Sequence, residues 1–245
     1  MIAFVNVGLE YKQKKSAIQV IKNLNLVIEQ GSFTCILGPS GCGKTTLLNI
    51  IAGFQSQSEG EVFIGDTPIR KAKIHLSYIF QGHNIFPWKT VRQNILFGLS
   101  SSRLTTAEKN KRVEEMAVEV GLRDHIDEYP QSLSGGMRQR VGIARALIGA
   151  PSIILMDEPF ASLDALTALK MRGMLKELCE QHKVTVVFVT HNIEEALEIG
   201  DRIIVMSKSP MKILFDKNIT NKSRSTELLM LKNEVYSMLE SNLNE

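Results

Sequence analysis

The fold is decided by the stretch Gly38-Pro39-Ser40-Gly41-Cys42-Gly43-Lys44-Thr45, which follows a short apolar segment and precedes a helical pattern. The stretch matches the phosphate-binding loop pattern in full, in which glycines allow successive backbone N–H groups to turn around phosphate oxygens. The start of the following helix adds a dipole that favours an anion. A plain glycine-rich turn would not explain the Lys-Thr pair with the correct segment on either side. The sequence therefore predicts a nucleotide-binding protein with ATP and Mg²⁺ as cofactors.

Individual residues of the loop receive separate roles. We expect Lys44 to reach the β- and γ-phosphates of the nucleotide and the Thr45 hydroxyl to ligate Mg²⁺. Thr46 extends the phosphate-binding stretch by one residue. Cys42 is interpreted as a small side chain that can still react with thiol reagents, because nearby positive charge lowers a thiol pKa.

Apolar periodicity outward from the loop alternates strands with helices, which favours an α/β fold with a parallel sheet covered by helices. A capping box, Thr105 with Glu108, predicts a helix start within the helical pattern of 91–121. Strands are predicted at 2–10, 24–28, 33–37, 61–64, 76–80, 152–156, 184–189 and 202–206, and helices at 44–52, 136–148, 165–182, 192–199 and 226–239.

An acidic pair, Asp157 and Glu158, ends the apolar strand at 153–156. The carboxyl edge of a parallel sheet is where α/β proteins bind their ligands. Asp157 is suited to hold Mg²⁺ through its water shell, and Glu158, pointing the other way by strand alternation, to orient and deprotonate the attacking water. An acidic strand end that simply meets solvent is the alternative, and the phosphate loop upstream favours catalysis.

Composition limits the classes of protein that remain. The chain has 245 residues, 44% of them hydrophobic and 22% charged, and its formal net charge of +3 does not indicate a nucleic-acid partner. Its three cysteines have no metal-ligand spacing. No apolar run approaches the roughly 20 residues that cross a bilayer, so any role at a membrane is expected to depend on a partner.

A second motif narrows the choice among phosphate-loop enzymes. The segment Leu133-Ser134-Gly135-Gly136-Met137 resembles the Leu-Ser-Gly-Gly-Gln signature of the ABC ATPases, with Met137 in place of glutamine. A serine and two glycines at a helix start form a second anion-binding surface. An ordinary Ser-capped helix start is the alternative, but it does not explain a second such surface so far along the chain.

The resemblance to ABC ATPases covers nearly the whole chain and implies further site residues. Tyr11 occupies the place of the aromatic residue that stacks on adenine. Gln81 matches the Q-loop glutamine that contacts Mg²⁺ and senses the membrane partner. Asp164, in Ser162-Leu163-Asp164, matches the D-loop, and His191 matches the switch histidine, which acts with Lys44 on the transferred phosphoryl group.

The same resemblance implies the architecture and the mechanism. A single ABC ATPase domain over residues 1–245 is expected, with a P-loop (RecA-like) core and an antiparallel β layer from 1–30 and 60–75. A helical subdomain is inserted at about 88–150. The amphipathic pattern of the tail, 226–239, separately predicts a short C-terminal helix at 226–240. Two copies form an ATP-dependent homodimer in which the signature of one completes the site of the other, and hydrolysis moves a separate permease.

The segment Phe86-Pro87-Trp88-Lys89-Thr90-Val91 resembles the corresponding segment of nitrate, sulfonate and taurine importer ATPases, and pyrimidine-precursor importers share much of it. The implied partners are integral membrane permease subunits and an extracellular solute-binding protein, with no nucleic acid, at the cytoplasmic face of the cell membrane. Exporter ATPases and soluble non-transport ABC ATPases are the alternatives. Trp88 is either a permease anchor or a core residue.

Overall fold

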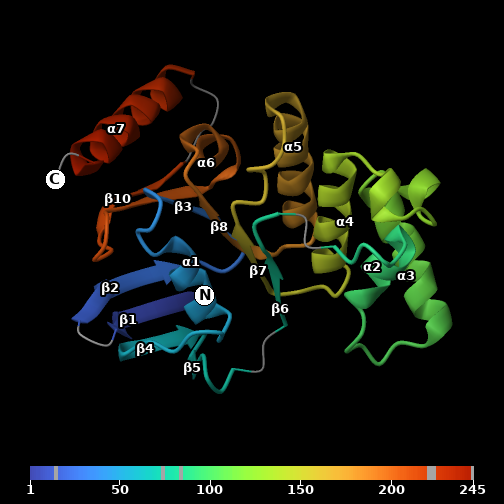
Figure 1. Cartoon of the computed structure of the whole chain (residues 1–245), viewed down its shortest axis with the longest axis horizontal. Coiled ribbons are helices and arrows are strands. Elements are labelled where there is room, and N and C mark those ends of the chain that lie inside the picture. Colours follow the sequence, from blue (N-terminus) through green and yellow to red (C-terminus); the bar gives the residue numbers. More distant parts are fainter. Residues whose placement is uncertain (14–15, 73–74, 83–84, 220–224, 244–245) are drawn as a thin grey trace. The chain divides into compact units, whose positions relative to one another are not determined.

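The computed structural model (Figure 1) describes residues 1–13, 16–72, 75–82, 85–219 and 225–243. The chain forms two compact units. The first combines Met1–Lys73 with Thr185–Glu245, and the second is Ile74–Val184. No helix within the described ranges is long and apolar enough to span a membrane. The expected boundaries of a helical subdomain at 88–150 stay a prediction.

The first unit contains an antiparallel sheet with the strand order β2-β1-β4-β5. Its strands are β1 (Ile2–Gln13), β2 (Ser16–Ile28), β4 (Glu59–Ile64) and β5 (Thr67–Pro68). Every neighbouring pair is antiparallel, which confirms the expected antiparallel layer. Four apolar side chains of β1 are buried: Ile2, Phe4, Val7 and Leu9.

A second group of strands in the first unit supports the phosphate loop. β3 (Phe33–Leu37) lies between β8 (Thr185–Thr190) and β9 (Arg202–Met206), and both pairs are parallel. All residues of β3 and β8 are buried, as expected for near-continuous apolar strands in a parallel sheet covered on both faces. β10 (Ile213–Asn218) pairs antiparallel with β9 and was not predicted.

Among the residues that the structure describes, the helices of the first unit are α1 (Lys44–Ile51), α6 (Ile193–Ile199) and α7 (Ser225–Leu243). α7 packs against α6 (Figure 1), and two apolar side chains of α7, Leu231 and Val235, are buried at 5% and 0% exposed. The C-terminal helix predicted from its amphipathic pattern is therefore present, and longer than expected at its C-terminal end.

The second unit has a parallel pair of strands, β6 (Leu76–Ile79) and β7 (Ile153–Asp157). Its helices are α2 (Val91–Phe97), α3 (Thr106–Glu119), α4 (Gly135–Leu147) and α5 (Ala165–Gln181), with short 3-10 turns at Arg123–His125 and Pro130–Ser132.

Capping boxes fix where two of these helices begin. Thr105 accepts a hydrogen bond from the backbone N–H of Glu108, whose side chain accepts one from the Thr105 N–H, which confirms the predicted start of α3. Thr90 and Gln93 form the same arrangement at α2. The helical pattern of 91–121 is thus two helices, separated by the segment that ends at Thr105.

Candidate functional site

The phosphate loop in the first unit holds its lysine inside its own turn. Lys44 is 6% exposed, and its Nζ donates hydrogen bonds to the carbonyl oxygens of Gly38 at 2.7 Å and Pro39 at 3.0 Å. Gly43 precedes α1 with a φ of 107°, and as a glycine it has no side chain with which to cap the helix. The start of α1 therefore offers backbone N–H groups and a helix dipole that favour an anion.

Two positions of the loop require glycine because neighbouring side chains leave no room for a Cβ atom. A Cβ atom at Gly38 would lie 2.8 Å from Sγ of Cys42, and one at Gly43 would lie 2.8 Å from Cγ1 of Val20. Cys42 itself is 2% exposed, and burial raises the pKa of its thiol despite the opposing charge of Lys44. The expected reactivity of Cys42 toward thiol reagents is therefore corrected, because burial outweighs the positive charge.

Strand pairing brings His191 and the phosphate loop to the same edge of the first unit. β3 and β8 are parallel, and Leu37 is paired with Thr190. The next residues along the chain, Gly38 and His191, therefore leave the sheet side by side at its carboxyl edge. This proximity comes from the register, which the sequence alone did not give.

The turn that carries His191 is fixed by buried polar contacts. The Thr190 hydroxyl donates to Oε2 of Glu195 at 2.6 Å and accepts from the Asn192 N–H at 3.0 Å. The Asn192 side chain caps α6 by accepting from the N–H groups of Glu194 and Glu195. His191 is exposed, so its imidazole can meet a ligand while its backbone is held.

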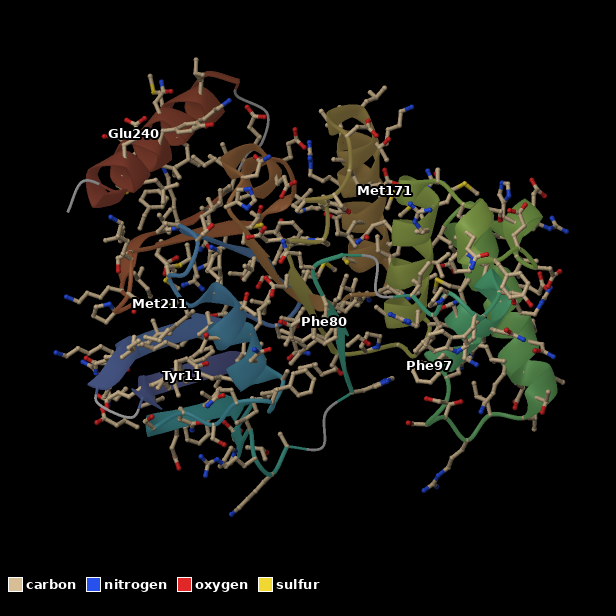
Figure 2. All side chains as sticks on the ribbon, in the orientation of Figure 1. Tyr11, Phe80, Phe97, Met171, Met211 and Glu240 are labelled. Carbon is tan, nitrogen blue, oxygen red and sulfur yellow. The ribbon has the colours of Figure 1, made fainter. Side chains whose placement is uncertain are left out.

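Tyr11 lies on β1 opposite Ile18 of β2, and it is 40% exposed. Figure 2 labels it on the antiparallel sheet. An exposed aromatic side chain offers a surface for stacking. Its contact with adenine stays a prediction.

In the second unit, Asp157 is the last residue of β7 and is 8% exposed. Tyr78, on the adjacent strand β6, forms a hydrogen bond with its carboxylate. Burial, the negative charge of Asp157 and this hydrogen bond together raise the pKa of Tyr78, so its hydroxyl stays protonated and donates. Tyr78 also stacks on Phe80, with 4.1 Å between ring centroids. Sequence reasoning assigned Tyr78 no role, because Asp157 lies far from it along the chain and only the pairing of β6 with β7 brings them together.

Glu158 does not continue the strand. β7 ends at Asp157, and Glu158 has a φ of 45°, in the left-handed region that side chains with a Cβ rarely adopt. The argument that strand alternation turns Glu158 away from Asp157 is therefore wrong, since a change in backbone direction separates them. Such strained positions concentrate at functional sites.

The signature segment begins a helix that packs closely on its neighbour. Ser134 is the N-cap of α4, and its hydroxyl accepts from the Met137 N–H at 3.3 Å. A Cβ atom at Gly136 would lie 2.7 Å from Cγ2 of Thr167, in the first turn of α5. Glycine is therefore needed here for packing, whatever its role toward phosphate.

The proposed D-loop residue Asp164 is the N-cap of that neighbouring helix. Its carboxylate accepts from the Thr167 N–H at 3.0 Å, and this bond is the main cause of its lowered pKa. Gly135 also approaches Leu163, where a Cβ atom would lie 3.5 Å from Cδ2. The signature and D-loop segments are thus adjacent within the second unit.

The predicted site residues divide between the two units. The first unit holds Tyr11, the loop from Gly38 to Thr46, and His191. The second holds Gln81, which is exposed and follows β6, together with Ser134, Gly135, Gly136, Asp157, Glu158 and Asp164. The oxygen donors of Thr45, Gln81 and Asp157 are hydroxyl, amide and carboxylate, which suit Mg²⁺.

A family model described as "ABC transporter" matches residues 21–161 of the chain. The chain belongs to the ABC transporter family. It is an ATPase of that family, which binds ATP and couples hydrolysis to transport. This assignment also agrees with the phosphate loop, the acidic pair and the signature segment described above.

Curated relatives of this ABC ATPase are similar over most of their length. The aliphatic sulfonates import ATP-binding protein SsuB of Bacillus cereus is 42% identical over 90% of this chain and 86% of its own. A putative ATP-binding protein of Brucella abortus is 42% identical over 86% and 80%. The bicarbonate transport ATP-binding protein CmpD of Synechocystis is 39% identical over 84% and 73%.

A solved structure confirms the predicted fold. The ATP-binding cassette MJ0796, in a dimeric post-hydrolysis state bound to ADP and Pi, has a TM-score of 0.77 and 35% identity. The comparison covers 90% of this chain and 100% of that one.

Proposed function

We propose that this ABC ATPase is the Mg²⁺-dependent motor subunit of a solute importer and acts on a separate permease from the cytoplasmic face of the membrane. The observation that carries the import direction is the 42% identity to an aliphatic sulfonate import subunit over 90% of the chain. The segment containing Phe86, Pro87 and Trp88 agrees with that subgroup. An exporter ATPase or a soluble non-transport ABC ATPase is the alternative.

The site residues supply the parts that phosphoryl transfer needs. Lys44 contacts the terminal phosphates, and Thr45, Gln81 and Asp157 hold Mg²⁺, which neutralises charge on the phosphate oxygens when bound. Glu158 orients and deprotonates the attacking water. His191, at the sheet edge beside the phosphate loop, donates to the transferred phosphoryl group.

The complete site is shared by two copies of the chain. Ser134 is exposed at the start of α4, where the N–H groups of Gly135 and Gly136 add an anion-binding surface. We infer that this surface meets the γ-phosphate of ATP bound by the other copy. The dimeric state of the neighbouring cassette supports this arrangement.

An aromatic cluster in the second unit is the proposed permease-binding surface. Trp88 is 69% exposed, which contradicts the core interpretation of this residue. Its ring lies 5.6 Å from that of Phe86, which makes an edge contact with Phe97 at 4.8 Å. Arg145 lies 5.2 Å over the Phe86 ring. Exposed large aromatic residues beside an arginine are typical of interface anchors.

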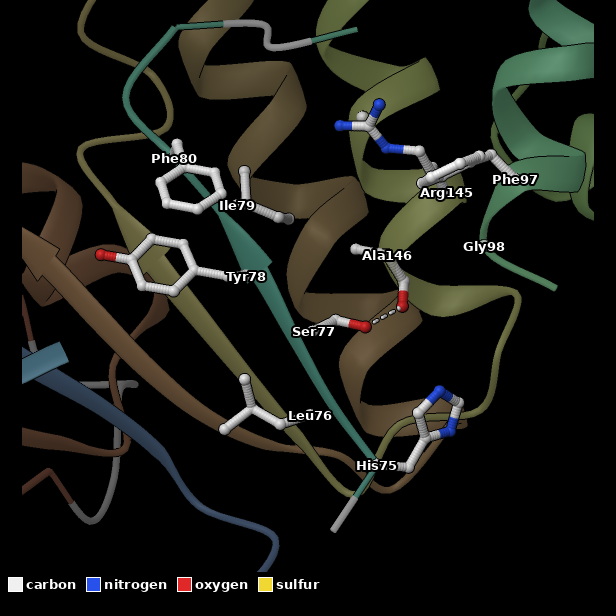
Figure 3. Close-up of a pocket in the computed structure, with 11 residues that line it drawn as sticks. His75, Leu76, Ser77, Tyr78, Ile79, Phe80, Phe97, Gly98, Arg145 and Ala146 are labelled. Atoms are coloured by element: carbon white, nitrogen blue, oxygen red, sulfur yellow. Dashed lines mark hydrogen bonds between the residues drawn. The ribbon is translucent and has the colours of Figure 1, made fainter. Parts of the chain in front are cut away.

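Next to this cluster, β6 and α4 border a cavity of about 220 Å³ (Figure 3). Tyr78 and Phe80 line its strand side, and Phe97 and Arg145 line its helix side. We propose that a segment of the permease inserts here. Because Tyr78 also bonds Asp157, insertion would act on the acidic pair through one side chain.

The proposed solute class comes from the segment around Trp88, and a relative named for aliphatic sulfonate import supports its sulfonate member. A nitrate-, sulfonate- or taurine-like anion, or a pyrimidine precursor, is delivered to the permease by an extracellular solute-binding protein, and no nucleic acid takes part. The ATPase itself does not contact the solute. The chemistry of the solute is therefore decided by the permease and the binding protein.

Reconstitution with the permease encoded nearby tests this function. We expect ATPase activity in proteoliposomes to rise when the binding protein and its solute are added, with alkanesulfonates, nitrate, bicarbonate and pyrimidine precursors compared in parallel. Stimulation by a solute presented on the ATPase side instead would identify an exporter. Co-purification with ribosomes or DNA, and with no permease, would exclude a role in transport.

A further inference from the structure

A second cavity, of about 370 Å³, lies between α2 and α3 and has no part in the ATP site. We call it the α2–α3 cavity. Lys89 and Gln93 line it from the start of α2, Phe97 and Leu99 from its end, and Lys109 from α3. Its volume is in the range of small-molecule binding pockets.

The charge of the α2–α3 cavity is of one sign. Lys89 and Lys109 are the charged residues of its lining, and no carboxylate borders it. Within the described part of the chain, neither lysine forms an ion pair. Two ammonium groups across one concave surface favour an anion, since nothing in the lining neutralises them.

The lining also contains polar side chains that form no hydrogen bond within the described residues. Ser100, Thr106 and Asn110 supply two hydroxyl groups and an amide. Thr106 lies in the first turn of α3, where the helix dipole also favours negative charge. These groups can donate hydrogen bonds to the oxygens of an acid.

The rest of the wall is apolar. Leu96 and Leu99 lie beside Phe97, whose ring is 49% exposed and is labelled on α2 in Figure 2. Phe97 lines both this cavity and the smaller one beside β6. An inorganic anion would leave this apolar wall facing water, whereas a ligand with a short hydrocarbon body would cover it.

We propose that the α2–α3 cavity binds a small soluble organic anion, in which a carboxylate, sulfonate or phosphate ester is carried by a short apolar body. The acid group lies between Lys89 and Lys109, and the body lies against Leu96 and Phe97. Such a ligand ties α2 to α3 and contacts the residue that follows Trp88. The proposal concerns a site separate from ATP and does not depend on the proposed function.

The chain carries its own reporter, because Trp88 is its single tryptophan. We would titrate the nucleotide-free protein with butane-1-sulfonate at constant ionic strength, following Trp88 fluorescence and the heat of binding. Saturable binding at one site is expected. Butylammonium, which has the same body and the opposite charge, and sulfate, which has no body, are expected to give no saturable change. Equal binding of butylammonium or of sulfate would overturn the proposal.

Three glutamine variants locate the site. Lys89→Gln and Lys109→Gln should each weaken binding about two- to fivefold, and together about tenfold, as expected for partly exposed charge contacts. Lys111→Gln is the matched control, because Lys111 lies on α3, pairs with Glu115 and does not line the cavity. Melting curves confirm that the variants are folded. An equal loss in all three variants, or none, would contradict the assignment.

A lipid headgroup shares this acid chemistry, and vesicles separate it from a soluble ligand. We expect the isolated protein not to co-float with phosphatidylglycerol vesicles. Flotation with these vesicles that is lost in the Lys89→Gln/Lys109→Gln variant would assign the cavity to a lipid and overturn the soluble-ligand proposal.

Discussion

At the level of single residues, Glu158 has both an unfavourable left-handed backbone conformation and a proposed catalytic role. A left-handed conformation at a residue with a Cβ costs on the order of 1–3 kcal/mol, and the surrounding structure must impose it. The chain bends at Glu158 directly after β7 ends at Asp157, so the two carboxylates do not follow the side-chain alternation of one strand. The conformation therefore supports the separate roles proposed for the two carboxylates.

Glu158→Gln should bind ATP normally and hydrolyse it at least about 100-fold more slowly, since the amide keeps the shape of the side chain but cannot accept the proton. Trapped ATP should hold two copies together on a sizing column. Phosphate release and elution volume measure the two effects.

Glu234→Gln serves as the control for Glu158→Gln, because it removes an exposed carboxylate on α7 that has no role in the site. Its turnover should equal that of the unaltered protein. If Glu158→Gln also kept near-normal turnover, the assignment of the general base would be wrong.

At the level of elements, the signature glycines serve packing as well as phosphate. α4 and α5 meet at their N-terminal ends, where Gly136 faces the methyl group of Thr167 at a distance that leaves no room for a Cβ. The two helix starts carry Ser134 and Asp164. Their relative position therefore depends on the absence of one methyl group.

Gly136→Ala should lower the free energy of unfolding by about 1–3 kcal/mol, because the added methyl group is forced against Thr167. Thr167→Ser removes the opposing methyl group and keeps the backbone N–H that bonds Asp164, so the double variant should recover much of the loss. Urea unfolding of the unaltered protein, the two single variants and the double variant gives the coupling energy between residues 136 and 167.

Gly173→Ala is the contrasting change in α5. A Cβ atom at Gly173 would have no neighbour within 4 Å, and helical alanine is favoured over glycine by about 0.5–1 kcal/mol. This variant should therefore be more stable than the unaltered protein. A destabilised Gly173→Ala, or additive losses in the Gly136 and Thr167 variants, would contradict the packing argument.

The elements themselves were largely predictable, because their patterns are local. Apolar periodicity located the strands on both sides of the phosphate loop, and the capping box at Thr105 located the start of α3. β10 was missed because its residues are mostly exposed and its mixed sequence, Ile-Leu-Phe-Asp-Lys-Asn, shows no clear alternation of apolar and polar residues. The pairing of Leu37 with Thr190 depends on tertiary structure.

Within the site, residue types were predictable and geometry was not. The motifs pointed to Lys44, Asp157 and Ser134, but not to the bond between Tyr78 and Asp157 or to the left-handed turn at Glu158. Both features are imposed by neighbouring strands and loops. A single sequence carries no local signal for them.

At the level of the whole molecule, the proposed dimer places the signature segment of one copy against the ATP that the other copy binds. Ser134→Arg should leave ATP binding by the isolated subunit unchanged, because the phosphate loop is untouched, and should abolish dimer formation and turnover. Equilibrium nucleotide binding and sizing chromatography measure the two outcomes. Ser101→Arg, an equal charge change at an exposed position of the same unit, should affect neither.

A mixture of Ser134→Arg with Lys44→Ala gives a further test, since a heterodimer of the two contains one intact site. We expect one ATP to be retained per heterodimer. Loss of ATP binding in the isolated Ser134→Arg subunit would show that the site is complete within one chain.

Attachment to the permease should depend on Trp88. Because this side chain is exposed, Trp88→Ala should change the free energy of unfolding by no more than about 0.5 kcal/mol. The variant should bind ATP but fail to co-purify with its permease in detergent. Tyr129→Ala, which removes another exposed aromatic residue of the second unit, should still co-purify. A Trp88→Ala subunit that binds the permease normally would exclude the anchor role.

The ammonium group of Lys44 donates two hydrogen bonds to backbone carbonyl oxygens, so nucleotide binding must exchange these hydrogen bonds for new ones to phosphate. The carbonyl oxygens of Gly38 and Pro39 already accept from this ammonium group. Phosphate oxygens must replace these two acceptors, so the new hydrogen bonds add little net binding free energy. The net affinity is then a small difference between two bonded states. A loop built this way holds a stray inorganic anion weakly, and it releases the product phosphate without leaving a buried charge uncompensated.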